Sequence, residues 1–504
     1  MQGSKHCDGR LFYQVSLELL VPQDHMLRRL AKEVELGWVR TATAELYSNT
    51  GKPSIDPVVI AKMMIIGFLY NINSERQLMR EIQVNLAYRW YLSYDLDEDI
   101  PNHSVLSKAR RRLGQHFFER LFGSVLQLCR QFGLINGSNV LIDSTLVRGN
   151  ASVESVTALK YSPAQYFQQL DAVAEPEEQV DVDQRQKGDE LGSNRPGDNR
   201  LCDQKRSTTD PDATLARKGK TTVLGYKTHV CADSHKGVIT AVTVSTAAAD
   251  DTSAVPELLD KHSDALDEMP LRVGADGAYG SQDCLAYFQN KGIETVIKKR
   301  SGGNKHGGYD KSNFVYDASG DVFTCPAGSQ LRRIRTDIKK SKAHYQCDAC
   351  CCGSCVRRSA CLGENSTARA RTVTRFDTPY EARAQASCSS YLGRKLLMVR
   401  QTLLEGLFGQ GKNFHGLGRA RWRGLGNMFI QSLLIATVLN VKKLLSSSRR
   451  AASSIAASAG YTFDIILQIS GLCLAILILH PPIDSKKSCE TMLQVVRGEI
   501  WNVS

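Results

Sequence analysis

The sequence lacks a run of about 20 apolar residues, the length that an α-helix needs to cross a bilayer. Its most apolar stretch, residues 465–479, is shorter and is flanked by Asp464 and by Pro481 and Pro482. We interpret this stretch as a buried or partner-facing helix, with a membrane anchor as the alternative. No signal peptide is recognisable, because residues 1–20 are polar and carry several charged side chains. These features favour a cytoplasmic protein that does not bind a membrane.

The sequence also has no internal repeat, and acidic residues are in the minority. The 52 Asp and Glu residues face 64 Lys and Arg residues, which gives a formal net charge of +12. Such a surplus of positive charge indicates a polyanionic partner, with nucleic acid as the first choice. The 504 residues, 42% of them hydrophobic, are enough for two or more ordinary globular domains.

Cysteine is concentrated in one segment: seven of the 15 cysteines lie between positions 325 and 361. In a chain without an export signal, such clustering favours metal binding over disulfides. A Cys-x2-Cys pair followed by two more cysteines can hold tetrahedral zinc. The predicted ligands are Cys325, Cys347, Cys350, Cys355 and Cys361. The neighbouring Cys351 and Cys352 leave the choice of ligands open, and free thiols in a poorly ordered loop are the alternative.

Three acidic residues occur where a carboxylate could serve chemistry. Asp143 follows the apolar run 140–142, which predicts a buried central strand; Asp276 ends a second short strand, and Glu405 lies in a helical pattern. A buried carboxylate is costly unless it is paired or binds a metal, and three oxygen ligands from three elements could hold two divalent ions. Asp143 could equally cap the following turn. Asp250-Asp251 is a rival for the second acid, but no apolar strand precedes it, so capping of the next helix is its expected role.

The first 135 residues read as mostly helical. Helices are predicted over 58–70 and after the capping residue Ser74, and a basic helix is predicted over 105–113. The basic helix could enter a DNA groove as part of a helix-turn-helix, or it could be the solvated face of a helical bundle. Its candidate DNA-binding residues are Arg110, Arg111 and Arg112.

From residue 136 onward, predicted strands and helices alternate, which is typical of a mixed α/β layer fold. The strands are 140–142, 226–232, 238–246, 271–276 and 294–298, and the helices are 254–266 and 282–291. Residues 171–212 are polar and read as a mobile loop. Residues 301–374 interrupt the pattern and hold the cysteines, together with basic runs at 332–335 and 339–342. These basic residues could form a surface that contacts phosphate, or they could simply be solvated.

Seven motifs occur in a fixed order along roughly residues 17–445. They are I-D-P-V-V-I-A-K at 55–62, N-L-A-Y-R-W-Y at 85–91, L-I-D-S-T at 141–145, T-D-P-D-A at 209–213, G-Y-K-T-H-V at 225–230, A-D-G-A-Y-G at 275–280 and L-E-G-L-F-G-Q-G-K at 404–412. In this combination the chain resembles bacterial insertion-sequence transposases of the DDE class.

The resemblance implies an α/β RNase H-like core, a mixed five-stranded sheet with helices on both faces, plus an all-α N-terminal domain. It divides the chain into an N-terminal DNA-end-binding domain (1–135), a catalytic core (136–300 and 375–445, with a mobile loop over 150–215), a cysteine-rich basic insertion (301–374) and a tail (446–504). The core is implied to carry Asp143, Asp276 and Glu405 as catalytic ligands of two Mg²⁺ or Mn²⁺ ions. The insertion would add a structural Zn²⁺.

The family pattern around the glutamate is only partly present. Lys412 lies seven residues after Glu405, as expected for a DNA-binding lysine on the same helix face. Upstream, Met398 and Gln401 stand where a Tyr and an Arg are usual, with Arg400 one residue away.

The implied activity is metal-dependent cleavage at the ends of a mobile element and transfer of the freed 3′-hydroxyls into target DNA. The implied partners are double-stranded DNA, as terminal inverted repeats and as target, and a second copy of the chain. We expect a bacterial cytoplasmic protein that associates with the nucleoid. The alternatives are a transposase-derived DNA-binding protein without catalysis and, resting on residues 465–479, a membrane-associated nuclease.

Overall fold

The computed structural model describes residues 16–48, 50, 54–158, 205–219, 221–298, 308–337, 342–363, 366–376 and 380–448. Residues 1–444 form one compact unit and residues 445–504 a second. Most of the predicted loop at 150–215, part of the basic run at 339–342, the tail after 448 and its apolar stretch 465–479 lie outside the described residues.

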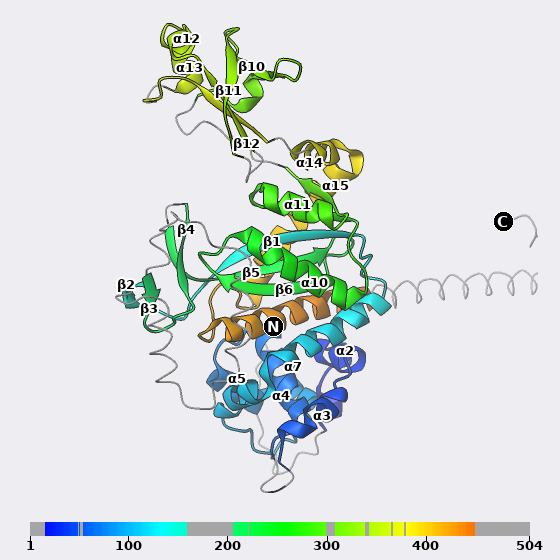
Figure 1. Ribbon diagram of the computed structural model, residues 1–504. Coiled ribbons are helices and arrows are strands. Elements are labelled where there is room, and N and C mark those ends of the chain that lie inside the picture. The colour runs from blue at the N-terminus through cyan, green and yellow to red at the C-terminus, as the bar shows by residue number, and fades with distance from the viewer. Residues whose placement is uncertain are drawn as a thin grey trace, which may run out of the picture. The chain divides into compact units, whose positions relative to one another are not determined.

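A mixed six-stranded sheet forms the centre of the first unit (Figure 1). Its strands are β1 (Asn139–Arg148), β4 (Thr214–Lys218), β5 (Thr221–Asp233), β6 (Ile239–Thr246), β7 (Arg272–Ala275) and β8 (Glu294–Ile297). β5 pairs antiparallel with both β1 and β6, whereas β1, β7 and β8 run parallel. The spatial order β6-β5-β1-β7-β8 confirms the predicted RNase H-like sheet. β4 is an additional strand that forms a hairpin with the start of β5.

Helices cover both faces of this sheet, as predicted. Side chains alternate along a strand, so Val140 and Ile142 of β1 face the core cluster formed with α10 (Val255–Leu266), α11 (Gln282–Asn290) and α14 (Tyr380–Ser389). On the opposite face Gly274 lets Leu141 and Leu396 approach closely, because a Cβ there would lie 3.0 Å from Leu141 and 3.2 Å from Leu396. Leu396 belongs to α15 (Tyr391–Phe414), so this contact seats α15 on the face of the sheet opposite α10 and α11.

The N-terminal helices follow the predicted pattern with two corrections. The elements are α1 (Leu17–Leu20), α2 (Met26–Glu33), α3 (Trp38–Thr43), α4 (Pro57–Leu69), α5 (Glu75–Val84), α6 (Leu86–Leu92) and α7 (Ser104–Gln131). The helix predicted after Ser74 is two helices, because the Asn85 side chain accepts the backbone N–H groups of Ala87 and Tyr88 and starts α6. The basic helix extends far beyond residue 113, with a break at Gly114, whose φ is 66°.

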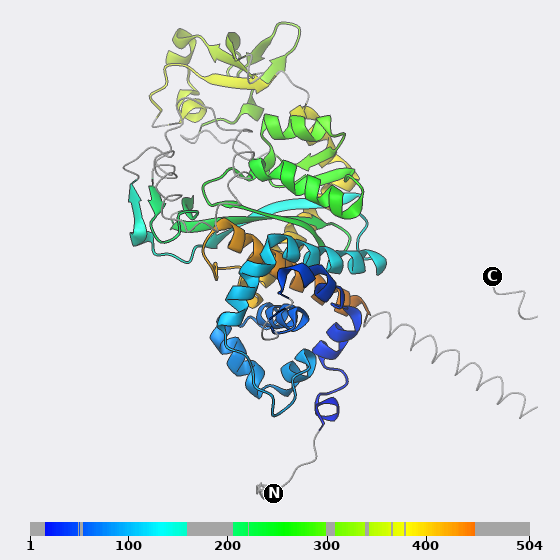
Figure 2. The ribbon, with the colours of Figure 1, turned by 60° about the horizontal axis from the view of Figure 1, so that its bottom comes forward.

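The N-terminal helices make polar contacts with the segment that follows α15. The helix Leu425–Ser448 lies between them and the sheet in both views (Figures 1 and 2). His415 Nδ1 lies 2.8 Å from the carbonyl of Phe68, and Arg421 donates to the carbonyl of Ile72. The Leu425–Ser448 helix is long and apolar enough to cross a membrane, but 89% of its apolar window is buried inside the protein, as in a core helix. The N-terminal helices therefore share an interface with residues 415–440, and the division at 135 stays a prediction.

The cysteine-rich insertion forms a second sheet that the sequence did not predict. Its antiparallel strands, in the order β13-β12-β11-β10-β9, are β9 (Val315–Asp317), β10 (Val322–Thr324), β11 (Gln330–Asp337), β12 (Lys342–Cys347) and β13 (Thr372–Phe376). Two short helices, α12 (Ala349–Gly353) and α13 (Arg358–Leu362), follow β12. A small cluster that includes Phe314, Phe323, Leu331 and Tyr345 forms its core.

Candidate active site

The sheet brings two of the three predicted carboxylates together. β1 and β7 are parallel neighbours, and the paired positions run from Asn139 with Arg272 to Leu141 with Gly274. Continuing this register by two residues places Asp143 opposite Asp276, each just past the apolar part of its strand. Adjacent parallel strands lie about 4.8 Å apart, so the two side chains can share one ion.

Asp143 sits in a partly dehydrated position. Its Oδ1 accepts the backbone N–H of Ser144 at 2.8 Å, and its Oδ2 lies 3.1 Å from Nη2 of Arg400 on α15. Burial raises the pKa of the Asp143 carboxyl, and the negative charges of Asp276 and Asp251 raise it further, whereas Ser144 and Arg400 act in the opposite direction. A carboxylate in such surroundings gains from a cation, because a cation offsets both the burial and the repulsion.

Asp276 has a structural role besides its place beside Asp143. Its Oδ1 accepts the N–H of Ala278 at 2.7 Å and so caps the short 3-10 helix Gly277–Tyr279. This bond fixes the carboxylate at the end of β7. The capping interpretation and the functional interpretation of this acid are therefore compatible.

The structure does not bring Glu405 to the two aspartates. Glu405 is exposed, whereas Leu396, Leu404 and Leu407 mark the buried side of α15. Glu405 lies five residues after Arg400, which on a helix is a rotation of about 140°, so the two side chains project from different sides. Within the described ranges, no three His, Cys, Asp or Glu side chains are placed to hold one metal ion.

The relation between Glu405 and Lys412 agrees with the prediction. α15 continues to Phe414 despite the glycines that follow Glu405. Seven residues on a helix return to nearly the same side, so Lys412 shares the side of Glu405, and it is half-buried. Whether Lys412 contacts DNA stays a prediction.

Asp251 is a residue near the site to which the sequence assigned only a capping role. It begins the 3-10 helix Asp251–Ala254 after β6, where its Oδ1 accepts the Ser144 hydroxyl at 2.8 Å and pairs with Lys227 Nζ at 3.0 Å. Burial raises the pKa of the Tyr279 hydroxyl, and the negative charges of Asp251 and Asp143 raise it further.

Arg110 does not belong to the DNA-binding surface, which corrects one predicted site residue. Its side chain is buried, pairs with Glu75 at 2.9 Å, and stacks on the ring of Trp422 at 3.6 Å. Arg111 and Arg112 are exposed, and the guanidinium of Arg112 lies 4.8 Å from the ring of Tyr47. Consecutive helical residues are rotated by about 100°, which explains why only one of the three faces the protein.

The basic run of the insertion lies on strand β11. Arg332 and Arg335 are exposed there, and so is Ile334 between them. Arg333 is partly neutralised, because it pairs with Asp321 at 2.8 Å and donates to the hydroxyl of Tyr345. The strand therefore offers two exposed guanidinium groups that a phosphate could contact.

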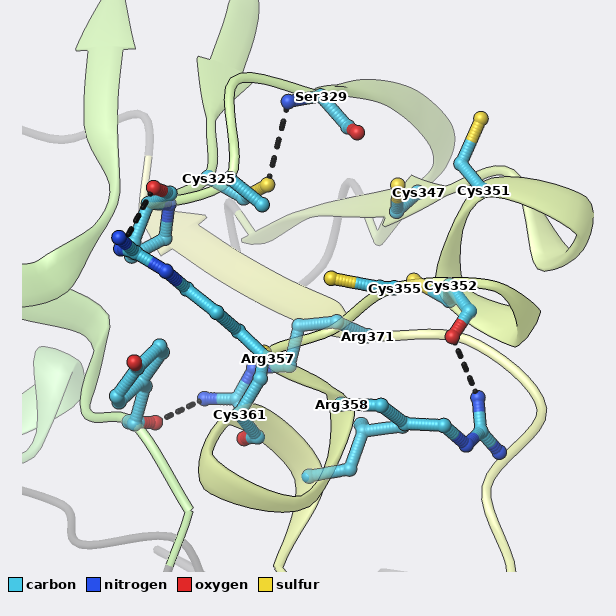
Figure 3. A pocket seen from close by; sticks show the side chains of 14 residues that line it. Cys325, Ser329, Cys347, Cys351, Cys352, Cys355, Arg357, Arg358, Cys361 and Arg371 are labelled. Carbon is cyan, nitrogen blue, oxygen red and sulfur yellow. Dashed lines mark hydrogen bonds between the residues drawn. The ribbon is translucent and has the colours of Figure 1, made fainter.

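Six cysteines of the insertion line one small cavity of about 30 Å³ (Figure 3). They are Cys325, Cys347, Cys351, Cys352, Cys355 and Cys361. The backbone N–H of Ser329 lies 3.3 Å from Sγ of Cys325, and in Figure 3 the sulfur of Cys351 points away from the gap between Cys325 and Cys355. Cys350, a predicted ligand, is exposed and does not line the cavity. Cys352 takes its place.

Three family models match the chain. A transposase domain of the DUF772 family matches residues 15–112, and two transposase DDE domain models match residues 200–382 and 324–445. Both DDE models extend into the cysteine-rich insertion. A search among curated proteins gave no match.

One solved structure found in the comparison is a piggyBac transposase synaptic complex with hairpin DNA. The two chains are 9% identical, the alignment covers 94% of this chain and 82% of that chain, and the TM-score is 0.31.

Proposed function

This chain belongs to the DDE-class DNA transposases, and we propose that its Asp143 and Asp276 hold divalent metal for cutting element ends and joining them to target DNA. The observation that carries the proposal is the register of β1 and β7, which sets the two carboxylates side by side. Burial raises the pKa of Asp143, and the neighbouring Asp276 and Asp251 raise it further, which supplies the electrostatic reason for a cation there.

The carboxylate pair fits Mg²⁺ or Mn²⁺, which prefer oxygen ligands and keep several waters. Bound ions would lower the pKa of the attacking water or 3′-hydroxyl and stabilise the leaving oxygen. In this proposal the reacting phosphate would lie beside the carboxylates at the ends of the apolar parts of β1 and β7. Glu405 remains our proposed third ligand, and its participation requires α15 to present another side to the sheet.

We propose double-stranded DNA as the partner, both as the inverted repeats of the element and as its target, with two copies of the chain acting together. Exposed cations on separate elements, Arg111 and Arg112 on α7 and Arg332 and Arg335 on β11, support a broad phosphate contact. A DNA-bound protein of this kind would reside with the nucleoid in the cytoplasm of a bacterium.

We also propose a structural zinc in the cysteine-lined cavity of the insertion. Thiolates are preferred zinc ligands, and six cysteines line one cavity that also has Arg357, Arg358 and Arg371 in its lining. Burial raises the pKa of the Cys347 and Cys361 thiols, and the positive charge of Arg371 opposes this rise at Cys361. Zinc binding requires the sulfur atoms to turn toward a common centre, and Cys325, Cys347, Cys352 and Cys355 are the proposed set, with Cys361 as the spare ligand.

The function is tested with the full chain, DNA carrying the element's ends, and a target plasmid. We expect strand-transfer products in Mg²⁺ or Mn²⁺ and none in a chelator. Asp143→Asn, Asp276→Asn and Glu405→Gln should each abolish cleavage while end binding persists, since affinity comes from Lys and Arg on phosphates. Asp283→Asn, at an exposed position of α11, is the matched control and should keep activity.

Activity within about tenfold of the unmodified chain would remove the altered residue from the site. If the unmodified chain binds its ends tightly but never cleaves them in either metal, the protein is a DNA-binding protein derived from a transposase, without catalysis.

A further inference from the structure

Arg400 and Asp143 form an ion pair at the place where the metal is proposed to bind. Nη2 of Arg400 lies 3.1 Å from Oδ2 of Asp143, and the side chains are only 18% and 24% exposed. A pair sheltered to this degree is stronger than one on the surface, because less water screens the charges. Arg400 thus supplies the positive charge that Asp143 needs in the absence of metal.

The Arg400–Asp143 pair lacks part of the hydrogen bonding that a permanent structural salt bridge needs. Buried salt bridges stabilise a fold only when the remaining donors are also satisfied. Nε of Arg400 is buried and has no hydrogen-bond partner among the described residues. The guanidinium therefore holds Asp143 through one contact, which a divalent ion with a stronger claim on the carboxylate can replace.

The same helix carries the proposed third ligand on another side. α15 directs Arg400 toward β1, while Glu405 is exposed. In this arrangement Asp143 faces a cation of the chain instead of a third carboxylate. A divalent ion and the Arg400 guanidinium would compete for Oδ2 and repel each other, so the Arg400–Asp143 contact weakens metal binding.

We propose that Arg400 is a positioning residue that blocks Asp143 in the DNA-free chain and lowers its affinity for metal until the contact opens. This inference rests on the proposed function, because it takes Asp143 and Asp276 as the metal site. It adds that the resting protein binds catalytic metal weakly, which protects host DNA from unpaired cleavage.

The test is Mn²⁺ binding to the full chain without DNA, measured by the electron paramagnetic resonance signal of free Mn²⁺. Arg400→Gln should lower the Mn²⁺ dissociation constant about tenfold or more, because a competing charge about 3 Å from the ligand is gone. Arg400→Lys keeps the charge and should remain close to the unmodified chain. Arg394→Gln, at an exposed position of the same helix, is the matched control and should change nothing.

Asp143→Asn separates the two ways in which the account can fail. If Asp143→Asn removes a Mn²⁺ site but Arg400→Gln, folded by circular dichroism, binds no tighter, Arg400 does not block the site and only this inference is wrong. If Mn²⁺ binding never depends on Asp143, the proposed function and the inference both fail. Tighter binding in Arg400→Lys, to the same degree as in Arg400→Gln, would also contradict the proposal, since charge would then be irrelevant.

Discussion

The central sheet and the sheet of the insertion keep their structure by different means. The central sheet packs β1 and β7 against α10 and α11, and its core includes large buried side chains such as Tyr279 and Phe288. The insertion sheet has a small apolar cluster, helices of only five residues, and a cavity lined by thiols. Small domains that bury little apolar surface commonly depend on a metal or disulfides. The proposed catalytic residues thus lie in a sheet stabilised by packing, whereas we propose that the insertion depends on zinc held by its cysteines.

The largest expected effect is the loss of zinc from the insertion. Structural zinc contributes roughly 10 kcal/mol or more to folding of a small domain. We therefore expect about one zinc per chain, and rapid hydrogen exchange throughout β9–β13 once a strong chelator removes it, while β1 and β7 stay protected. Cys352→Ser should reproduce this result, and Cys350→Ser, outside the cavity, should not. Folded and reduced protein that contains no zinc would contradict the proposal that zinc stabilises the insertion.

A cavity made in the core of the central sheet should have the opposite effect: it should destabilise the central sheet and leave the insertion sheet intact. Phe288 is fully buried between α11 and the sheet, so Phe288→Ala should cost about 3–5 kcal/mol in the free energy of unfolding. Urea denaturation followed by hydrogen exchange should show loss of protection in β1 and β7 with β9–β13 unaffected. Equal loss in both sheets would mean that they unfold as one cooperative unit.

A smaller effect concerns pH. His262 is buried beside Thr240, and burial lowers its pKa to about 4. Between the ordinary pKa of about 6.5 and this value, the unfolded chain binds a proton that the folded chain does not. Stability is therefore fully present above about pH 6.5 and falls as the pH drops toward 4, by at most about 3 kcal/mol. His229, whose pKa is also lowered to about 4, adds to the slope.

His262→Gln checks this pH dependence in thermal unfolding. The variant should reduce by about half the dependence of the unfolding temperature of the central sheet on pH. The unfolding of the insertion should not change. An unaltered slope would assign the acid sensitivity to other groups.

The smallest expected effect is a difference in DNA binding between variants of α7 and variants of β11. Arg111→Ala on α7 should reduce the preference for element ends by about 1–3 kcal/mol if that residue reaches a base edge. Arg332→Ala and Arg335→Ala on β11 should weaken binding to all DNA and reduce the salt dependence. The measurement is a titration of end and random DNA at several salt concentrations with the full chain, because the N-terminal helices share an interface with residues 415–440. An equal loss on both DNAs for Arg111→Ala would move end recognition to the insertion.

The sequence predicted five strands of the central sheet because they are rich in β-forming residues and carry short buried apolar runs such as 140–142. It did not predict the insertion sheet, whose strands are short and partly exposed, with Arg332 and Arg335 on the surface of β11. Among the site residues, the setting of Asp143 and Asp276 was predictable from the apolar runs before them. The burial of Arg110 depends on Glu75 and Trp422, and the direction of Glu405 depends on how α15 packs, so both required the tertiary structure.

The central claim is that Asp143 and Asp276 bind a metal ion that also contacts the reacting phosphate. Its most direct test replaces one nonbridging oxygen of the scissile phosphate with sulfur, since Mg²⁺ binds sulfur poorly and Mn²⁺ binds it better. For the sulfur position that faces the carboxylates, we predict that cleavage by the full chain falls about 100-fold or more in Mg²⁺ and recovers in Mn²⁺. Cleavage in Mg²⁺ that is unchanged by sulfur at either position, or a loss that Mn²⁺ never reverses, would contradict the claim.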